Sequence, residues 1–148
     1  MVTPVVTVTP RTTYEDAAFL LHKHRVSGMP VVDNGDVLVG IISEKDLFQA
    51  LYPLYAEYIS TPEAYTDQEK QEGEIENIRR QPVEKYMKRH VITVDANACV
   101  LNAGGLMLAH GIHRLPVTLN GKLVGIVTRE DIYGTILTKH LGENIKKG

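Results

Sequence analysis

The sequence lacks several features that would assign a protein to a specialised class. Among its 148 residues it has one cysteine, Cys99, so no disulfide can form within the chain. No apolar run approaches the ~20 residues that a membrane-spanning helix needs, and the opening residues lack the basic start of a secretory signal. The formal net charge of −2 gives no overall positive field to attract nucleic acid. These absences predict a soluble protein of a reducing compartment, the cytoplasm, with no membrane and no nucleic-acid partner.

The usual signatures of catalysis and metal binding are absent as well. The histidines show no metal-ligand spacing with cysteine or acidic partners. The sequence has no nucleophile–base pair with a supporting acid, and no G-x-x-x-x-G-K-[ST] phosphate loop. We therefore expect neither a bound metal nor an enzyme.

The chain contains an internal repeat. The segment SGMPVVDNG (27–35) aligns with HRLPVTLNG (113–121), so that Pro30 falls on Pro116 and Gly35 on Gly121. The segments that follow, LVGIISEKDL (38–47) and LVGIVTREDI (123–132), also align. Two copies of one unit, separated by an insert, are the simplest explanation.

Each copy has the pattern of a β-α-β-β-α unit. β-Branched stretches, amphipathic helical segments, buried strands that begin at Met-Pro or Leu-Pro, Asn-Gly turns and second strands occur in the same order in both. The first strands are expected at 5–8 and 91–94, the helices at 14–24 and 98–110, and the last helices after Ser43 and Thr128. One unit of about 60 residues has a small core. We therefore expect a mixed α/β fold in which the two repeats pack sheet against sheet about a pseudo-twofold axis, with the helices outside.

Two repeated motifs could bind a ligand or simply start a helix. Ser43-x-x-Asp46 and Thr128-x-x-Asp131 have the spacing of a helix N-cap, in which the hydroxyl accepts from a free backbone N–H. The same geometry could hold phosphate at the helix N-terminus, and the carboxylate could accept bonds from a ribose diol. Both roles can coexist.

The pair His113-Arg114 distinguishes the two copies. It stands directly before a core strand, where the first copy has Ser27 and Gly28. An arginine there could extend to solvent or pair with a surface acid. Alternatively, it could hold an anion in a cleft between the copies, and phosphate suits its planar fork.

The segments RVSGMPVVDNGDVLVGIISEKDL and GIHRLPVTLNGKLVGIVTREDI resemble paired cystathionine-β-synthase (CBS) domains, also called a Bateman module. The resemblance rests on the N-G turn, V-G-I-[IV]-[ST] and [ST]-x-x-D, each present twice. It divides the chain into repeat 1 (1–51), a helical insert (52–82), repeat 2 (83–141) and a tail (142–148). It also implies an adenosine ligand, which is AMP, ADP or ATP with or without Mg²⁺, or alternatively S-adenosylmethionine, and a homodimer.

The resemblance also implies the residues of two clefts. In the main cleft Thr128 would bind phosphate, Asp131 the ribose hydroxyls, and His113 and Arg114 the phosphate end. The adenine would lie against residues of the first repeat, namely Val6, Val26, Ser27 and Gly28. The second, pseudo-symmetric cleft would use Ser43, Asp46, Ile92, Ile112 and Leu115.

The insert carries tyrosines and then acidic residues. Tyr52, Tyr55 and Tyr58 recur every third residue, and Tyr65 follows. We expect an extended helical connection with the tyrosines against the core. A partner or dimer contact is the alternative, because tyrosine is common at interfaces.

Two functions remain open at this stage. The first is a regulatory module whose ligand changes the arrangement of the repeats or of a dimer, and so signals to an unidentified effector protein. The second is a ligand-independent homodimerisation scaffold in which the two motifs serve only as helix caps. An enzyme is the weakest reading.

Overall fold

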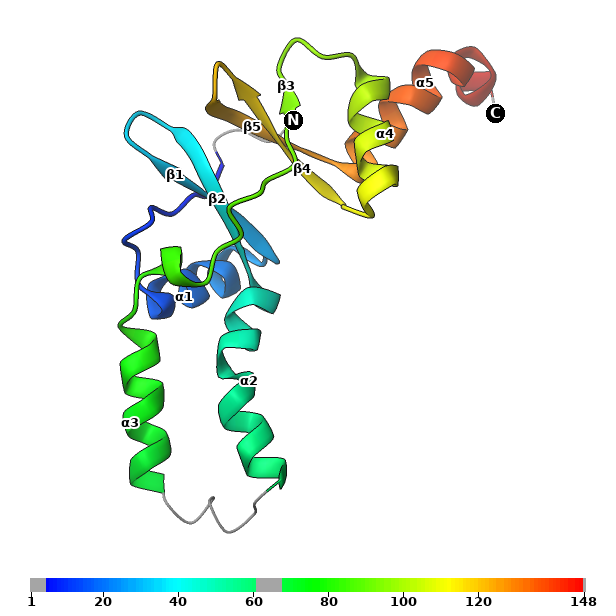
Figure 1. The fold of residues 1–148 in the computed structure, drawn as a ribbon. Helices are drawn as coiled ribbons and strands as arrows, with labels where there is room; N and C mark the ends of the chain where they lie inside the picture. Colours follow the sequence, from blue (N-terminus) through cyan, green and yellow to red (C-terminus); the bar gives the residue numbers. More distant parts are fainter. Residues whose placement is uncertain (1–4, 61–67, 148) are drawn as a thin grey trace. The chain divides into compact units, whose positions relative to one another are not determined.

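The computed structural model describes residues 5–60 and 68–147, with side chains in 5–52 and 72–139. The chain forms two compact units. The first-repeat unit comprises Val6–Asn34 and Val39–Val91, and the second-repeat unit contains Ile92–Gly148 together with the hairpin tip Gly35–Leu38. Figure 1 shows the elements of each unit along the chain. Within the described ranges, no helix has both the length and the apolar character needed to cross a membrane.

The first-repeat unit follows the expected order of elements. It contains α1 (Tyr14–His24), β1 (Gly28–Asp33), most of β2 (Val37–Ser43), α2 (Glu44–Ser60), α3 (Gln68–Arg79) and the short 3₁₀ helix η2 (Val83–Lys85). Helix α1 has its predicted bounds because both ends are capped. Thr13 Oγ1 accepts from Asp16 N at 3.1 Å, and Arg25 ends the helix in the left-handed conformation at φ 53°.

The first strand of this repeat is shorter than predicted. Instead of a strand over 5–8, Val8 alone pairs with Val31 as a parallel bridge. Val8 N donates to Pro30 O at 3.1 Å and Val32 N donates to Val8 O at 2.9 Å. A turn closed by the bond from Thr12 N to Thr9 O, 3.0 Å, follows at once, and Pro10 has no N–H to donate, so the pairing does not continue after this residue.

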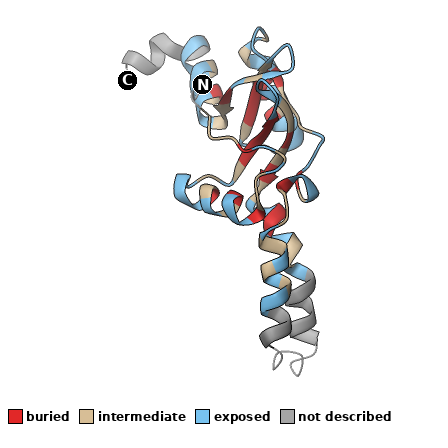
Figure 2. Ribbon diagram, turned by 90° about the vertical axis from the view of Figure 1, so that its left-hand side faces the viewer, coloured by how far each residue is buried: buried red, intermediate tan, exposed pale blue. Residues whose placement is uncertain are grey.

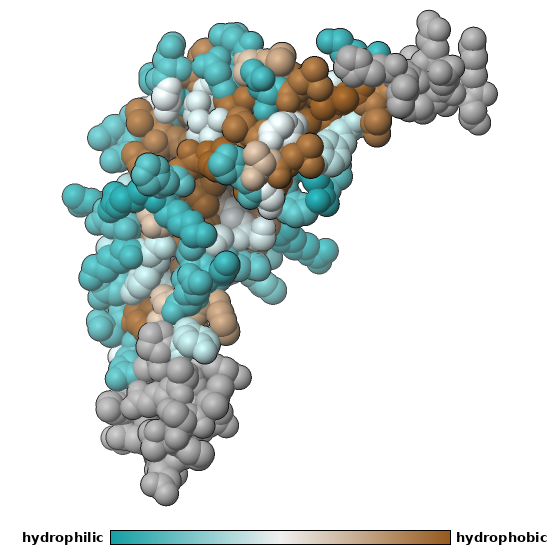
Figure 3. Space-filling view, turned by 45° about the vertical axis from the view of Figure 1, so that its right-hand side comes forward, coloured by the Kyte–Doolittle hydropathy of each residue, from teal (hydrophilic) through white to brown (hydrophobic). Residues whose placement is uncertain are grey.

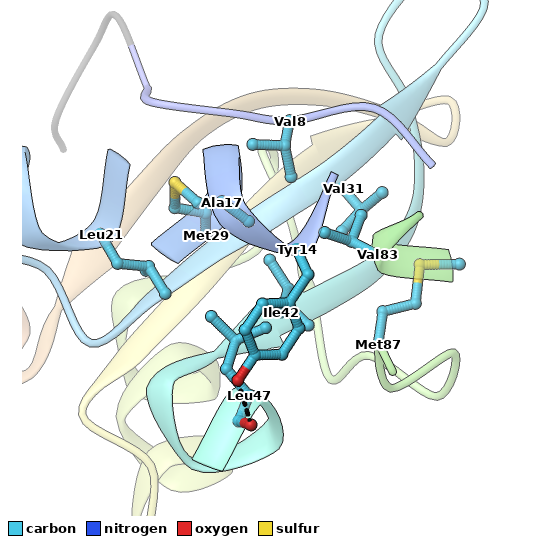
Figure 4. Close-up of a cluster of buried hydrophobic side chains, with 10 residues drawn as sticks. All are labelled: Val8, Tyr14, Ala17, Leu21, Met29, Val31, Ile42, Leu47, Val83 and Met87. Atoms are coloured by element: carbon cyan, nitrogen blue, oxygen red, sulfur yellow. Dashed lines mark hydrogen bonds between the residues drawn. The ribbon is translucent and has the colours of Figure 1, made fainter. Parts of the chain in front are cut away.

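The core of the first-repeat unit lies between α1, the strands and η2. Figure 4 shows the buried side chains Val8, Tyr14, Ala17, Leu21, Met29, Val31, Ile42, Leu47, Val83 and Met87. Tyr14 donates its hydroxyl to Leu47 O at 2.6 Å, and its ring meets Tyr86 edge to face. Burial raises the pKa of Tyr14, and the charge of Tyr86 raises it further. The contact joins α1 to the start of α2.

The second-repeat unit repeats this order. It contains β3 (Val94–Asp95), α4 (Val100–His110), β4 (Arg114–Leu119), β5 (Lys122–Thr128) and α5 (Arg129–Lys147). Strand β3 pairs parallel with β4, and β4 pairs antiparallel with β5. Its core consists of Val94, Ala103, Met107, Leu115, Val117 and Ile132. The mixed α/β class and the β-α-β-β-α order are therefore confirmed.

Several boundaries differ from the predictions by one to three residues. Helix α4 begins at Val100 rather than Ala98, because Cys99 at the N-cap has extended backbone at φ −75° and ψ 155°. Strands β1 and β4 begin before their Met-Pro and Leu-Pro pairs, at Gly28 and Arg114. The predicted Asn-Gly turns are confirmed: Gly35 and Gly121 have φ of 74° and 79°, and Asn120 has φ 54°.

The insert forms two helical segments. Helix α2 continues to Ser60, and α3 lies beside it on the return path (Figure 1). Buried residues concentrate on the strands and the helix faces turned toward them, as Figure 2 shows. Tyr52 is 55% exposed, so the prediction that it packs against the core is wrong. Its position on the outer face of α2 follows from Leu47, which takes the buried face. The predictions for Tyr55, Tyr58 and Tyr65 lie outside the described residues.

Candidate ligand-binding site

Three predicted ligand residues lie at one end of β4 and β5 in the second-repeat unit. Arg114 and Thr128 are directly opposite each other in the antiparallel pair, so their side chains share a face of the sheet. Arg129 N donates to His113 O at 2.7 Å and ties the start of α5 to the start of β4. His113, Arg114 and Thr128 are thus brought together at the N-terminus of α5.

The hydroxyl of Thr128 caps this helix. Asp131 N donates to Thr128 Oγ1 at 3.2 Å, the bond expected of an N-cap. Asp131 stands at the third position of α5 and is exposed. A helix N-terminus presents backbone N–H groups and the positive end of its dipole, an arrangement that favours an anion.

Arg114 contains a donor without a partner. Its side chain is half-buried, and within the described ranges its Nε atom is buried and makes no hydrogen bond. A buried donor left unpaired costs about 1–3 kcal/mol, more when it carries charge. An anionic oxygen beside Nε would remove that cost. His113, the neighbouring residue, is exposed.

The corresponding turn in the first-repeat unit is closed by its own side chains. Ser43 N and Ser43 Oγ both donate to Asp46 Oδ2, at 3.0 and 2.8 Å, and Asp46 N donates to Ser43 Oγ at 3.1 Å. Asp46 is only 5% exposed, and Lys88 Nζ lies 3.9 Å from its Oδ1. The Asp46 carboxylate thus serves a reciprocal capping box.

The backbone around this first turn repeats the arrangement of the second. Glu44 N donates to Ser27 O at 2.9 Å, and a Cβ added to Gly28 would lie 3.7 Å from Ser43 Cβ. Gly28 therefore occupies the place of Arg114, without a side chain. The structure brings Ser27, Gly28, Ser43 and Asp46 together within the first-repeat unit.

The remaining predicted residues are apolar and divide between the two cores. Val6 and Val26 pack against the first core, and Ile92 and Ile112 against the second. Leu115 is fully buried, so its side chain packs in the second core. The adenine-side residues lie in the first-repeat unit and the phosphate-side residues in the second.

Sequence reasoning missed Lys88 and a hollow of the first-repeat unit that Arg11 and Arg89 line. Lys88 reaches Asp46 because its backbone pairs with Ile41, through two N–H···O bonds of 2.9 Å. Asp131 also borders a second hollow, which is formed along α5 alone and includes Gly134 and Lys139. The described part of the chain contains no group of three metal-ligating side chains.

Known proteins resemble this chain across both repeats. A family model described as "CBS domain" matches residues 1–53 and 83–138. The CBS domain-containing protein YhcV of Bacillus subtilis is 32% identical over 132 residues, which are 89% of this chain and 79% of that protein.

Solved CBS structures share the fold. CBSX2, solved in complex with AMP, is 28% identical with a TM-score of 0.68, and the match covers 93% of this chain and 90% of that one. The CBS domain pair of protein MJ0100, solved with 5′-methylthioadenosine and S-adenosyl-L-methionine, is 28% identical with a TM-score of 0.66, covering 94% and 93%. The chain therefore belongs to the CBS domain family and carries two CBS domains in tandem.

Proposed function

We propose that this chain is a regulatory module that binds an adenosine nucleotide (AMP, ADP or ATP, with or without Mg²⁺) where its two repeats meet. One observation carries the proposal: Arg114, with its buried unpaired Nε, faces the same side of the sheet as Thr128 at the start of α5. Arginine forks and helix N-termini are both suited to phosphate. The AMP bound to CBSX2 adds support from a relative.

Each residue has a role that follows from its chemistry. The hydroxyl of Thr128 and the first amides of α5 donate to phosphate oxygens, while Arg114 adds charge-assisted bonds. The exposed carboxylate of Asp131 accepts from the ribose hydroxyls. The adenine packs against the first repeat, at Val6, Val26, Ser27 and Gly28. The cleft around Ser43 and Asp46 is the second candidate because Gly28, which stands at the position of Arg114, supplies no guanidinium there.

S-adenosylmethionine is the second candidate ligand. MJ0100 was solved with it, which favours a general adenosine site. S-adenosylmethionine has a carboxylate but no phosphate, so it would use the Arg114 fork with a single anionic group. Comparing its affinity with that of AMP therefore separates the two ligands.

Signalling follows from a change of arrangement, without catalysis by this chain. A ligand that binds one arrangement of the repeats, or of a homodimer, more tightly shifts the population toward it, and an effector protein responds. Leu101 and Leu108 lie two turns apart on α4 and are 59% and 73% exposed, and Leu137 of α5 is 51% exposed. Figure 3 shows the apolar surface of this helix pair, which supports a dimer contact. One cysteine suits a reducing compartment such as the cytoplasm.

Titration calorimetry and thermal unfolding test the proposal. AMP at 100 times its dissociation constant should add about 2.7 kcal/mol to the free energy of unfolding. Asp131→Ala should weaken AMP binding, whereas Asp16→Ala, which removes an exposed acid from the first turn of α1, should not. If AMP, ADP, ATP and S-adenosylmethionine all leave the melting temperature unchanged at millimolar concentration, the ligand-independent scaffold is the correct function.

A further inference from the structure

The first-repeat unit contains a hollow outside the proposed nucleotide site. Its volume is ≈ 500 Å³, within the range of roughly 300–1,000 Å³ typical of small-molecule pockets. Its lining includes Thr9, Arg11, Asp33, Glu84, Met87 and Arg89. Asp33 ends β1, whereas Gly28 begins it, so the hollow and the Gly28–Ser43 turn lie at opposite ends of that strand, about 17 Å apart at 3.3 Å per residue.

Three segments that are distant in the sequence hold the hollow in shape. Val83 N donates to Thr12 O at 2.8 Å and Glu84 N to Pro10 O at 3.2 Å, so η2 is fixed to the turn that follows Val8. Met87 is 9% exposed and packs against Gly40, where an added Cβ would lie 2.7 Å from its sulfur. The walls therefore belong to the folded unit and do not need a ligand to form.

The charges around the hollow are balanced but unpaired. Arg11 and Arg89 supply two guanidinium groups, while Asp33 and Glu84 supply two carboxylates. Within residues 5–52 and 72–139, none of the four forms an ion pair. The one contact of these carboxylates given by the structure is local, from Asn34 N to Asp33 Oδ1 at 3.0 Å. Donors and acceptors of opposite charge thus remain available around the hollow, whose lining also includes the apolar side chains of Val39 and Met87.

Two of the four charges have no counterpart in the second repeat. The repeat alignment places Asn97 at the position of Arg11 and Leu119 at the position of Asp33. Neither replacement carries charge, so the charges of Arg11 and Asp33 are not a requirement of the repeated fold. None of the four charged residues belongs to the set proposed for the nucleotide.

We propose that this hollow binds a free amino acid. A ligand with negative charge alone would meet Asp33 and Glu84, and one with positive charge alone would meet the two arginines, so a zwitterion is the best electrostatic match. Its α-carboxylate pairs with a guanidinium fork and its ammonium with a carboxylate. The remaining arginine or carboxylate pairs with the charged side chain of the ligand, while Met87 and Val39 contact the methylene groups of that side chain.

NMR titration of the full-length chain with L-glutamate, L-lysine, inorganic phosphate and putrescine tests this assignment. Either amino acid should shift the amide signals of residues 9–12, 33–40 and 84–89, with a dissociation constant of about 0.1–5 mM, the range expected for a ligand this small. Phosphate and putrescine should bind at least about tenfold more weakly. The assignment is overturned if neither amino acid binds at a concentration 20 times the upper limit of that dissociation constant. It is also overturned if phosphate binds as tightly as the amino acids.

Substitutions sharpen the test. Arg11→Ala combined with Arg89→Ala should weaken amino-acid binding at least about tenfold, whereas Arg80→Ala, which removes an exposed guanidinium directly after α3, should not. Glu84→Gln preserves the shape of the side chain, and it should weaken amino-acid binding while strengthening phosphate binding. Unchanged affinities in Glu84→Gln would contradict the proposal even if the double variant failed to fold. AMP affinity should be the same in all these variants, so the nucleotide site and this one can fail separately.

Discussion

The Ser43–Asp46 turn and the Thr128–Asp131 turn share one backbone arrangement but differ in the exposure of the carboxylate. In both, the first residue of a helix donates to the carbonyl before a strand, at 2.9 Å from Glu44 to Ser27 and 2.7 Å from Arg129 to His113. Asp46 is 5% exposed, whereas Asp131 is exposed. Duplication has thus kept the cap and varied its use.

The residue opposite the hydroxyl makes the larger chemical difference. Gly28 offers no side chain beside Ser43, whereas Arg114 brings a guanidinium beside Thr128. A cap that satisfies its own carboxylate stabilises the fold. An arginine opposite Thr128 makes the second turn chemically suited to an anionic ligand. The comparison therefore predicts that substitutions in the first turn affect stability and those in the second affect binding.

The largest expected effect concerns stability. Asp46→Ala should lower the free energy of unfolding by about 2 kcal/mol, because the hydroxyl and the partly buried backbone N–H of Ser43 both lose their acceptor. Asp131→Ala should cost less than about 1 kcal/mol, since that side chain is exposed. Urea unfolding followed by circular dichroism measures both. Equal losses would remove the distinction between the two turns.

Ligand affinity should show the reverse order. Thr128→Ala should weaken AMP binding by roughly tenfold, the value of one charge-assisted hydrogen bond. Ser43→Ala should change AMP affinity less than about twofold, because its hydroxyl is engaged with Asp46. Calorimetric titration of both variants gives the answer. A comparable loss in Ser43→Ala would mean that the first turn also binds the nucleotide.

A smaller effect separates the two repeats at alkaline pH. The folded-state pKa of Tyr14 is raised, mainly by burial, so its stabilising contribution is complete below the unfolded value of about 10 and is lost as the pH rises through the folded value. The repeat alignment places Val100 at the equivalent position. Tyr14→Phe should lose about 1 kcal/mol from the bond to Leu47 O and flatten the decline in stability above pH 10. The measurement is the free energy of unfolding of both proteins from pH 8 to 11. If it declines as steeply in Tyr14→Phe as in the unsubstituted chain, Tyr14 is not the source of the decline.

Local patterns in the sequence predicted much of this architecture. Helix α1 has its predicted bounds, because apolar residues recur at helical spacing from Tyr14 to His24. The Asn-Gly turns were found because their positive φ angles restrict the residue types. The repeat then predicted the second copy from the first.

Features that depend on contacts between residues far apart in the sequence could not be predicted from local patterns. The bridge between Val8 and Val31, and the bonds from η2 to the turn after Val8, join residues that are far apart in the sequence. The burial of Asp46 and the approach of Lys88 depend on how the segment after η2 crosses β2 at Gly40. Arg11 and Arg89 meet around one hollow for the same reason, and no spacing in the sequence relates them.

The most direct test of the account compares AMP with adenosine in the unsubstituted chain, in Arg114→Ala and in Lys122→Ala, whose substituted lysine lies at the opposite end of β5 from Thr128. Titration calorimetry should show that Arg114→Ala weakens AMP at least about tenfold while adenosine affinity is nearly unchanged, because only the phosphate contacts the guanidinium. Lys122→Ala should leave both ligands unaffected. Equal AMP affinity in the unsubstituted chain and in Arg114→Ala would contradict the claim that Arg114 binds the phosphate.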